Sequence, residues 1–354
     1  MDPFVFTTLP SRVLFGAGAL SMLPAEIARL DAKRVLLLST PGRTRLVASV
    51  AALLGPLFAG SYDKAVMHVP VSVAEDARRV ARELGADCCV AVGGGSTVGL
   101  GKAIALTTAM PVVCVPTTYS GSEMTTILGM TDGGRKTTLR DARVLPKVVV
   151  YDPELTLGLP PALSAASGIN AIAHSVEALY AHDANPVVSL MAEESIRALG
   201  AALPAVVAAP SDIGARGDAL YGAWLAGSAL GAVGMALHHK LCHVLGGTFN
   251  LPHAQTHAIL LPHAVHYNAA AAPQAMQRVA RALGAGDAAG GLHDLGTRLG
   301  IPMRLADIGM PEDGIERAAR IAVEAPYPNP RPVEYAPVLA LLRNAWAGRR
   351  PGQA

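Results

Sequence analysis

Four short apolar runs in the first half of the chain each end in polar or glycine-rich residues. They are residues 35–40, 87–96, 111–118 and 147–153. Apolar runs of this length that stop at turn residues are typical of strands buried in a parallel sheet. A helical pattern at residues 72–86 lies between the first two runs, and we expect it to begin at Ser72 and end at Gly85. Strands that alternate with helices predict an α/β domain whose parallel sheet is covered on both faces.

The second half of the chain has a different pattern. After Asp152 the sequence is rich in Ala and Leu, has helical periodicity and contains no further strong strand. The turn-forming stretch at residues 153–161 marks the change. A chain of 354 residues suits about two domains. We predict an α/β domain at residues 1–155 and an all-α domain at residues 156–354, with the PYPNPRP segment as a loop between the last helices.

Composition argues against several classes of protein. With 51% hydrophobic and 16% charged residues, the chain has ample material for a core. A net charge of +2 and the lack of a basic run argue against a nucleic-acid partner. No apolar run approaches ~20 residues and the start lacks a secretory signal pattern, so we expect neither a membrane span nor export. The four cysteines show no CxxC spacing, which favours free thiols in a reducing, cytoplasmic location.

A glycine-rich turn follows the second apolar run and leads into a helix. Gly93, Gly94 and Gly95 let the backbone approach a phosphate closely, and the helix amino terminus favours an anion. Ser96 adds a hydroxyl donor. The stretch is neither GxGxxG nor a Walker loop. We predict a phosphate-binding turn, and the alternative is a tight turn without a ligand.

Hydroxyl side chains cluster where the third apolar run ends. They are Thr117, Thr118, Ser120 and Ser122. The carboxyl ends of parallel strands are where open α/β sheets bind ligands. Alone, these residues would equally suit ordinary turns. Together with the glycine-rich turn they predict a dinucleotide-binding crevice.

The end of the first apolar run bears on the choice of dinucleotide. An acidic residue there favours NAD, because it binds the ribose 2′-hydroxyl and disfavours a 2′-phosphate. Ser39 and Thr40 are neutral, and Arg43 lies close to them in sequence. The sequence therefore predicts use of NADPH alongside NADH.

Residues 238–268 hold seven of the eleven histidines of the chain. His239 and His243 are one helical turn apart and project together, whereas the adjacent His238 points about 100° away. His253 begins a new element after a GGTFNLP turn. We interpret the cluster as functional. The three histidines that we interpret individually as packing residues are His257, His263 and His266.

Five motifs come in the order found in the iron-containing alcohol dehydrogenase superfamily, which the chain resembles over nearly its whole length. They are GGGSTVGLGKAI, PTTYSGSEMT, YDPELTLGLPP, SGINAIAHSVEALYA and HHKLCHVLGGTFNLPHAQTHAILLPH. The resemblance implies a Rossmann-like dinucleotide-binding domain followed by a helical domain, the architecture of dehydroquinate synthase and of group III alcohol dehydrogenases. It also implies a homodimer.

In metal-dependent members of this superfamily, an Asp and a His one helical turn apart bind a divalent metal together with two further His. By motif these positions fall on Asn170, His174, His239 and His253. Because Asn170 replaces the Asp, a divalent ion would lack the carboxylate that compensates its charge. We predict that no metal is bound, with zinc on three imidazoles as the alternative.

Three departures from the metal-dependent pattern resemble the maleylacetate reductase branch, which acts without a bound metal in bacterial aromatic-compound degradation. Gly99 stands where alcohol dehydrogenases carry Asp in GGGSxxDxxK, although Lys102 remains. The Thr-rich segment is one residue shorter, and Asn170 replaces the metal-binding Asp. The resemblance implies that NADH or NADPH reduces the carbon–carbon double bond of maleylacetate, a dicarboxylate, to give 3-oxoadipate.

Without a metal, protein donors must meet the negative charge that moves onto the ketone oxygen. His243, which by motif lies near the substrate and the nicotinamide, is the first candidate for proton donor, because an imidazole titrates near working pH. His253 and His239 are second candidates, and His174 and Asn170 would orient the substrate or the other rings. The alternative for each is packing in a vacated site.

A dianionic substrate also requires partners for its carboxylates. The candidates from the residues are Tyr119, Tyr327 and Arg331. A further basic group, which otherwise suits a solvated face, comprises Arg135, Lys136, Arg140 and Arg143. Within that group, Lys136 resembles a family lysine that contacts the cofactor.

Three alternatives stay open. A metal-dependent (iron or zinc) alcohol or glycerol dehydrogenase of the same fold would act on simple alcohols. A lyase similar to dehydroquinate synthase would require bound zinc. A non-catalytic nucleotide-binding protein would bind NADH but oxidise it with no oxo-acid.

Overall fold

The computed structural model describes residues 4, 6, 11–132 and 135–352. Among these residues, one compact unit contains residues 11–159 and another contains residues 160–352. The boundary that the sequence predicts between residues 155 and 156 stays a prediction.

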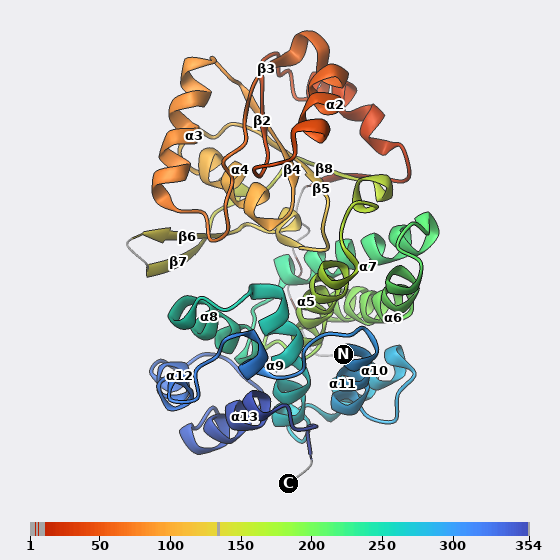
Figure 1. Ribbon diagram of the computed structural model, residues 1–354, viewed down its shortest axis with the longest axis vertical. Helices are drawn as coiled ribbons and strands as arrows, with labels where there is room; N and C mark the ends of the chain where they lie inside the picture. The colour runs from red at the N-terminus through yellow and green to blue at the C-terminus, as the bar shows by residue number, and fades with distance from the viewer. Residues whose placement is uncertain (1–3, 5, 7–10, 133–134, 353–354) are drawn as a thin grey trace. The chain divides into compact units, whose positions relative to one another are not determined.

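A six-stranded parallel sheet forms the centre of the first unit (Figure 1). Across the sheet the strands are β1 (Arg12–Phe15), β8 (Val148–Tyr151), β5 (Val112–Pro116), β4 (Cys88–Gly93), β2 (Val35–Leu38) and β3 (Phe58–Tyr62). Each neighbouring pair is parallel. The four apolar runs coincide with β2, β4, β5 and β8, so the predicted parallel sheet is confirmed.

Helices cover both faces of this sheet, as predicted. Val35 and Leu37 belong to a core shared with α1 (Leu23–Arg29) and α2 (Thr44–Leu54). The opposite face lies under α4 (Gly95–Thr108) and its neighbour α3 (Val71–Glu83). There Gly101 lies so near the sheet that an added Cβ would be 3.0 Å from Val112 Cγ1.

The start of α3 differs from the prediction. The helix begins at Val71, and Ser72 lies inside its first turn, so the predicted cap at Ser72 is wrong. Pro70 occupies the capping position with φ −57° and ψ 139°, and no side chain caps the helix. The proline ring fixes this φ and removes one N–H, which suits the entry to a helix. At the other end Gly85 adopts φ 58°, so the predicted end of the helix is confirmed.

An antiparallel hairpin in the first unit was not predicted. Strands β6 (Ile127–Asp132) and β7 (Arg135–Arg140) pair with Ile127 opposite Arg140. Polar residues make up most of β7, so it gives no apolar signal in the sequence.

The second unit is helical, as predicted, and none of its described residues belongs to a strand. Its helices are α5 (Pro161–Leu179), α6 (Pro186–Ala208), α7 (Ile213–Ala232), α8 (Leu237–Phe249), α9 (His253–Asn268), α10 (Pro273–Leu283), α11 (Ala288–Arg298), α12 (Gly314–Val323) and α13 (Tyr335–Ala347). The PYPNPRP loop lies between α12 and α13, as expected.

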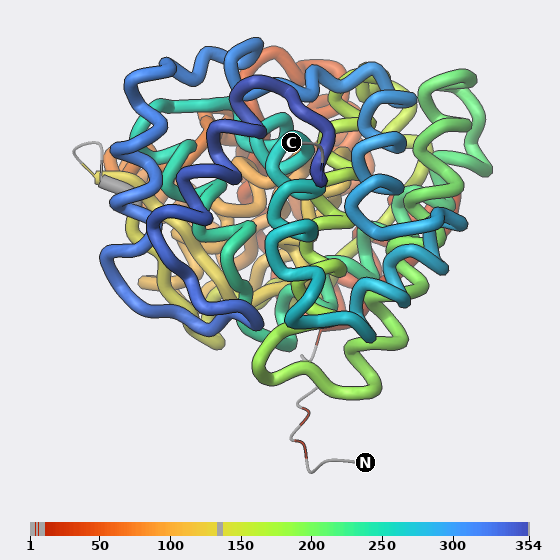
Figure 2. Tube along the Cα trace, turned by 90° about the horizontal axis from the view of Figure 1, so that it is seen from below, coloured from red at the N-terminus to blue at the C-terminus, as the bar shows by residue number. Residues whose placement is uncertain are grey.

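Two buried helices, α5 and α9, organise this unit. Helix α9 packs against α5, α8, α11 and α13, and Figure 2 shows it in turquoise with C-terminal helices on either side. From Gly168 to Leu179 every residue of α5 is buried. Polar side chains on such a helix must find hydrogen-bond partners inside the protein.

Membrane-spanning potential is weak in the described part of the chain. No single helix there is long and apolar enough to cross a bilayer. The helices α7 and α8 meet the criterion only as a pair, which is bent by 97°.

Burial of His263 on α9 predicts a loss of stability in mild acid. Burial, together with the nearby His293 and His266, lowers the pKa of His263 to about 4. The unfolded chain therefore takes up a proton near pH 6.5 that the folded protein resists until about pH 4. From pH 7 to pH 5 this group should reduce the free energy of unfolding by about 2 kcal/mol.

Urea unfolding of His263→Gln at both pH values measures this contribution. Between pH 7 and pH 5 the free energy of unfolding of the variant should fall by about 2 kcal/mol less than that of wild type. His182→Gln, which removes an exposed histidine, serves as the control and should lose as much as wild type. An unchanged pH dependence in His263→Gln would contradict the assignment.

Candidate functional site

The glycine-rich turn packs directly against the segment after β5. Gly93 ends β4 with φ 155°, a conformation that residues with side chains rarely adopt. An added Cβ at Gly94 would lie 2.9 Å from Thr118 Oγ1, and one at Gly95 would lie 3.2 Å from Ser120 Oγ. The Thr117 N–H donates to the Gly93 carbonyl at 3.0 Å. The structure thus brings together the turn and the hydroxyl cluster that the sequence singled out.

The amino terminus of α4 can hold a phosphate. Gly94 is its capping residue, and a glycine has no side chain to bond to the first turn. Gly95 is exposed and Ser96 is partly exposed, so backbone N–H groups and a hydroxyl are within reach of a ligand. Free N–H groups and the helix dipole both favour an anion at such a terminus. These residues fit the pyrophosphate of a dinucleotide.

Lys102 fixes the segment that follows the hydroxyl cluster. Its side chain is fully buried, and Nζ donates to the carbonyl oxygens of Ser122 (2.5 Å), Thr125 (2.8 Å) and Ile127 (2.9 Å). Burial lowers the pKa of Lys102 to about 8. Close to it, an added Cβ at Gly99 would lie 2.7 Å from Val69 Cγ2. Val69 therefore fills the space that an Asp at position 99 would need.

The remaining predicted cofactor residues are not equally accessible. Ser39 and Thr40 follow β2, which neighbours β4 in the sheet, so they share its carboxyl edge with the glycine-rich turn. Ser39 is 1% exposed and its hydroxyl has no hydrogen-bond partner among the described residues. Thr40, Thr118 and Ser122 are partly exposed. The side chain of Lys136 lies outside the part of the chain that the structure describes.

Two predicted histidines of the helical unit form a hydrogen-bonded chain with a carboxylate. His174 Nδ1 on α5 lies 2.8 Å from His239 Nε2 on α8. His239 Nδ1 lies 2.7 Å from Glu177 Oε2. All three side chains are buried. The predicted pair is thus joined to a residue that the sequence analysis missed.

Glu177 also bonds to the backbone at the start of α8. Its carboxylate accepts the N–H groups of Ala236 and His238, both at 2.8 Å. Glu177 follows His174 by three residues, which places both on one face of α5. That spacing is the sequence signal that identifies it, and it was not used.

His257 joins the other predicted histidines into one cluster. Its ring centroid lies 4.4 Å from that of His253 and 5.0 Å from that of His239. The sequence analysis interpreted His257 as a packing residue. Its spacing of four residues from His253 on α9 would have indicated a shared face.

Asn170 and His243 occupy opposite environments. Asn170 is 6% exposed, and its Oδ1 finds no hydrogen-bond partner in the described part of the chain. His243 is exposed, with its ring centroid 6.4 Å from that of His239. The predicted proton donor therefore has contact with solvent, whereas the predicted orienting residue does not.

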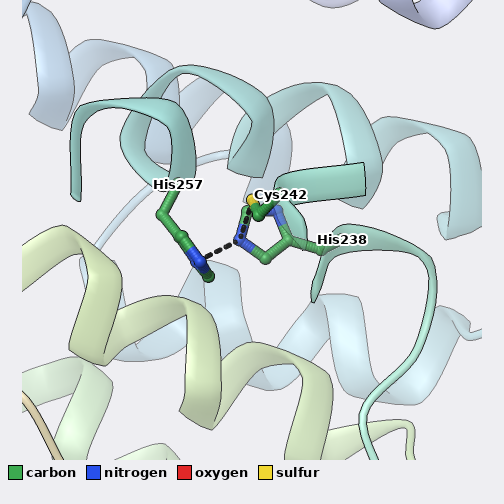
Figure 3. Close-up of side chains that lie close together, drawn as sticks. All are labelled: His238, Cys242 and His257. Atoms are coloured by element: carbon green, nitrogen blue, oxygen red, sulfur yellow. Dashed lines mark hydrogen bonds between the residues drawn. The ribbon is translucent and has the colours of Figure 1, made fainter. Parts of the chain in front are cut away.

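Figure 3 shows a second group, in which His238 and Cys242 of α8 face His257 of α9. His238 Nε2 lies 3.0 Å from His257 Nδ1 and 3.7 Å from Cys242 Sγ. Burial, reinforced by neighbouring histidines, lowers the pKa of both imidazoles well below its usual range. Both rings are therefore neutral, and one donates a hydrogen to the other. One nitrogen, one thiol sulfur and a second nitrogen lie within 4.8 Å of one another, a spacing found among metal ligands.

In both groups of histidines, hydrogen bonds occupy ring nitrogens that a divalent metal would use. A metal ligand needs an unshared lone pair on the binding nitrogen. One hydrogen lies between His174 Nδ1 and His239 Nε2, and the other nitrogen of His239 bonds to Glu177. His238 and His257 likewise share a hydrogen. A metal on either pair would have to replace these hydrogen bonds.

The three predicted partners of the substrate carboxylates lie in different settings. Tyr119 is fully buried in the first unit. Tyr327 is partly buried, and its pKa is raised by burial and then by the charge of Glu177. Arg331 is exposed and stacks on Tyr267, with its guanidinium carbon 4.3 Å from the ring centroid.

Comparison with known proteins was made for both units. The model of the iron-containing alcohol dehydrogenases matches residues 10–153, and that of the C-terminal part of the Fe-containing alcohol dehydrogenase family matches residues 164–346. A maleylacetate reductase of Burkholderia cepacia is 58% identical over 99% of this chain and 100% of its own length. A maleylacetate reductase of Sphingobium indicum is 58% identical over 98% of this chain and 99% of its own length. The crystal structure of maleylacetate reductase from Agrobacterium tumefaciens is 52% identical, with a TM-score of 0.96 over 99% of this chain and 100% of that one.

The packing of the glycine-rich turn predicts that Gly94→Ala weakens dinucleotide binding. The new methyl group would press on Thr118 Oγ1 and push the turn away from the hydroxyl cluster. We expect the dissociation constant for NADH to rise about tenfold or more, or ~1.4 kcal/mol. Titration of NADH fluorescence measures it. Gly158→Ala is the matched control, because no atom lies within 4 Å of its added Cβ. Equal affinities of the two variants would contradict the prediction.

Proposed function

The chain belongs to the iron-containing alcohol dehydrogenase family and is an oxidoreductase, and we propose that it is a maleylacetate reductase that works without a metal. It would use NADH or NADPH to reduce the carbon–carbon double bond of maleylacetate, giving 3-oxoadipate. Full-length relatives at 58% identity support the substrate. The observation that carries metal independence is the direct hydrogen bond between His174 and His239, beside a neutral Asn170.

The chemistry of the substrate sets what the protein must supply. Reduced nicotinamide, when bound, gives a hydride to the alkene carbon that is β to the ketone. The electron pair of the double bond then moves toward the ketone, and negative charge develops on the ketone oxygen. Hydrogen-bond donors at that oxygen strengthen as the charge grows, so they lower the barrier. A proton added to the α carbon completes the reduction.

We assign the proton to His243 first and to His253 second. His243 is exposed, so it can be reprotonated from solvent after each turnover. An imidazole with a pKa near working pH is an efficient general acid. His239 is less suited, because both of its ring nitrogens bond to the protein. His174 and Asn170 would orient the substrate.

For the substrate carboxylates we propose Tyr327 and Arg331 in the helical unit and Tyr119 in the first unit. Among the described residues, only Nη1 of Arg331 bonds to a carbonyl, that of Tyr267 at 3.4 Å, so Arg331 keeps most of its guanidinium donors while stacked on Tyr267. A planar guanidinium matches a carboxylate with two parallel hydrogen bonds.

A homodimer in the cytoplasm is part of the same proposal. The family resemblance supports the dimer. All four cysteines are buried free thiols, which suits a reducing compartment.

Removal of divalent metal should leave activity intact. Protein dialysed against EDTA should oxidise NADH on addition of maleylacetate at the undialysed rate, with metal content checked by mass spectrometry. Loss of activity that iron or zinc restores would show that the neutral site still binds an ion. No activity before or after dialysis would redirect the search to simple alcohols.

The neutral edge beside β2 predicts that both cofactors are used. Ser39 and Thr40 carry no charge, and Arg43 is exposed at the start of α2. We expect kcat/KM for NADPH and NADH to lie within about 100-fold of each other, because one acidic residue is what normally excludes the 2′-phosphate. Arg43→Glu should reduce kcat/KM for NADPH alone. A preference for NADH above roughly 1000-fold (~4 kcal/mol) in wild type would contradict this.

A further inference from the structure

We infer that Glu177 is a positioning residue, whose carboxylate holds His239 in the tautomer with hydrogen on Nδ1 and so directs the His239 Nε2 lone pair at His174. The catalytic meaning of this inference rests on the proposed function. The hydrogen-bond arrangement itself does not, and it is tested separately.

The carboxylate of Glu177 acts as an acceptor toward α8. Oε1 accepts the His238 N–H, and Oε2 accepts the Ala236 N–H, each at 2.8 Å. Ala236 is the capping residue of α8, and it makes no side-chain hydrogen bond to the first turn. The first N–H groups of a helix need an acceptor, and the helix dipole favours a negative one. Glu177 of α5 supplies that acceptor from another helix.

The acceptor character of Glu177 determines the tautomer of His239. Oε2 lies 2.7 Å from His239 Nδ1, so a hydrogen bond there requires the hydrogen on Nδ1. In a neutral ring the Nε2 atom then carries the lone pair. His174 Nδ1, at 2.8 Å, must be the donor to it. The order of donors along the chain is thus His174 to His239 to Glu177.

This order explains how Glu177 would act on the reaction. His239 has no ring nitrogen left for a ligand, so its effect passes through His174. The bond to His239 holds the His174 ring in one orientation and makes its other nitrogen more basic, as carboxylate–histidine pairs do elsewhere. Glu177 is therefore placed to act on His174 through His239, without touching the substrate.

A purely structural role is the competing explanation, because a buried cap of α8 also stabilises the fold. The tautomer of His239 distinguishes the positioning role of Glu177 from a purely structural role. A cap alone requires acceptors for the Ala236 and His238 N–H groups, and it sets no condition on the ring of His239. The first experiment therefore reads the ring itself.

Nitrogen chemical shifts of the full-length protein labelled with 15N-histidine distinguish the tautomers. The His239 signals are identified by their loss in His239→Gln. We expect His239 to carry hydrogen on Nδ1 and a lone pair on Nε2 in wild type. Hydrogen on Nε2 would overturn the inference, whether or not the protein reduces maleylacetate.

Kinetics of Glu177→Gln test the positioning effect. The amide keeps the shape of the side chain but has one acceptor oxygen, so its NH2 group must face a former donor. We expect kcat for maleylacetate to fall about 10- to 100-fold, with the KM for NADH unchanged. In the same variant the His239 hydrogen should move to Nε2. A kcat within twofold of wild type would overturn the positioning role.

Ser175→Ala is the matched control on the same helix. Its hydroxyl donates to Ser195 Oγ at 2.8 Å, away from Glu177, so its loss removes one buried hydrogen bond of α5. We expect lower thermal stability with unchanged kcat and unchanged His239 shifts. An equal fall in kcat in both variants would assign the effect to stability and overturn the inference. Failure of wild type to reduce maleylacetate would overturn the proposed function and leave the tautomer to decide this inference.

Discussion

The carboxylate of Glu177 lies in the interior of the helical unit, where it meets the first turn of α8. Transfer of an unpaired charge into such a place is far more costly than transfer of a paired one. The N–H groups of Ala236 and His238 offset that cost. Backbone N–H groups without a partner inside the helix occur at its amino terminus. The position of α8 against α5 is therefore tied to one side chain. Because His239 lies in the first turn of α8, its ring is positioned by the same contact.

Asn170 suits the ion-free site that we propose. Its Oδ1 has no partner among the described residues, which costs about 1–3 kcal/mol for a neutral acceptor. An Asp at the same buried place, with neither ion nor donor, would cost far more. A neutral side chain is thus what an ion-free site requires. His238 and His257 follow the same logic, because burial keeps both rings uncharged.

Local signals in the sequence predicted several elements, though not the hairpin of β6 and β7, and they did not predict contacts between distant residues. The apolar runs of β2, β4, β5 and β8, the glycine-rich turn and the helical second half all have a short-range pattern. The bond between Glu177 and His239 joins residues 62 positions apart, so no window of sequence contains it. The contacts of Lys102 were missed in the same way, since its motif was recognised but the carbonyl groups that it binds were not. The prediction of where α3 begins was wrong for a different reason, because Pro70 sets the backbone conformation there without a side-chain cap.

The two positions at which this chain lacks a carboxylate, 99 and 170, have separate local consequences. At position 99, Val69 fills the space that an Asp would need, and it does so with φ 44°, which is strained for a β-branched residue. Near position 170, His174 and His239 bond directly to each other, at two positions that resemble the metal ligands of metal-dependent relatives. The backbone of the chain stays close to that of the maleylacetate reductase from Agrobacterium tumefaciens, with a TM-score of 0.96. Neither Gly99 nor Asn170 carries a negative charge, and negative charges beside a site repel a dianionic substrate. The same two substitutions thus agree with an ion-free site and with the dicarboxylate that we propose as its substrate.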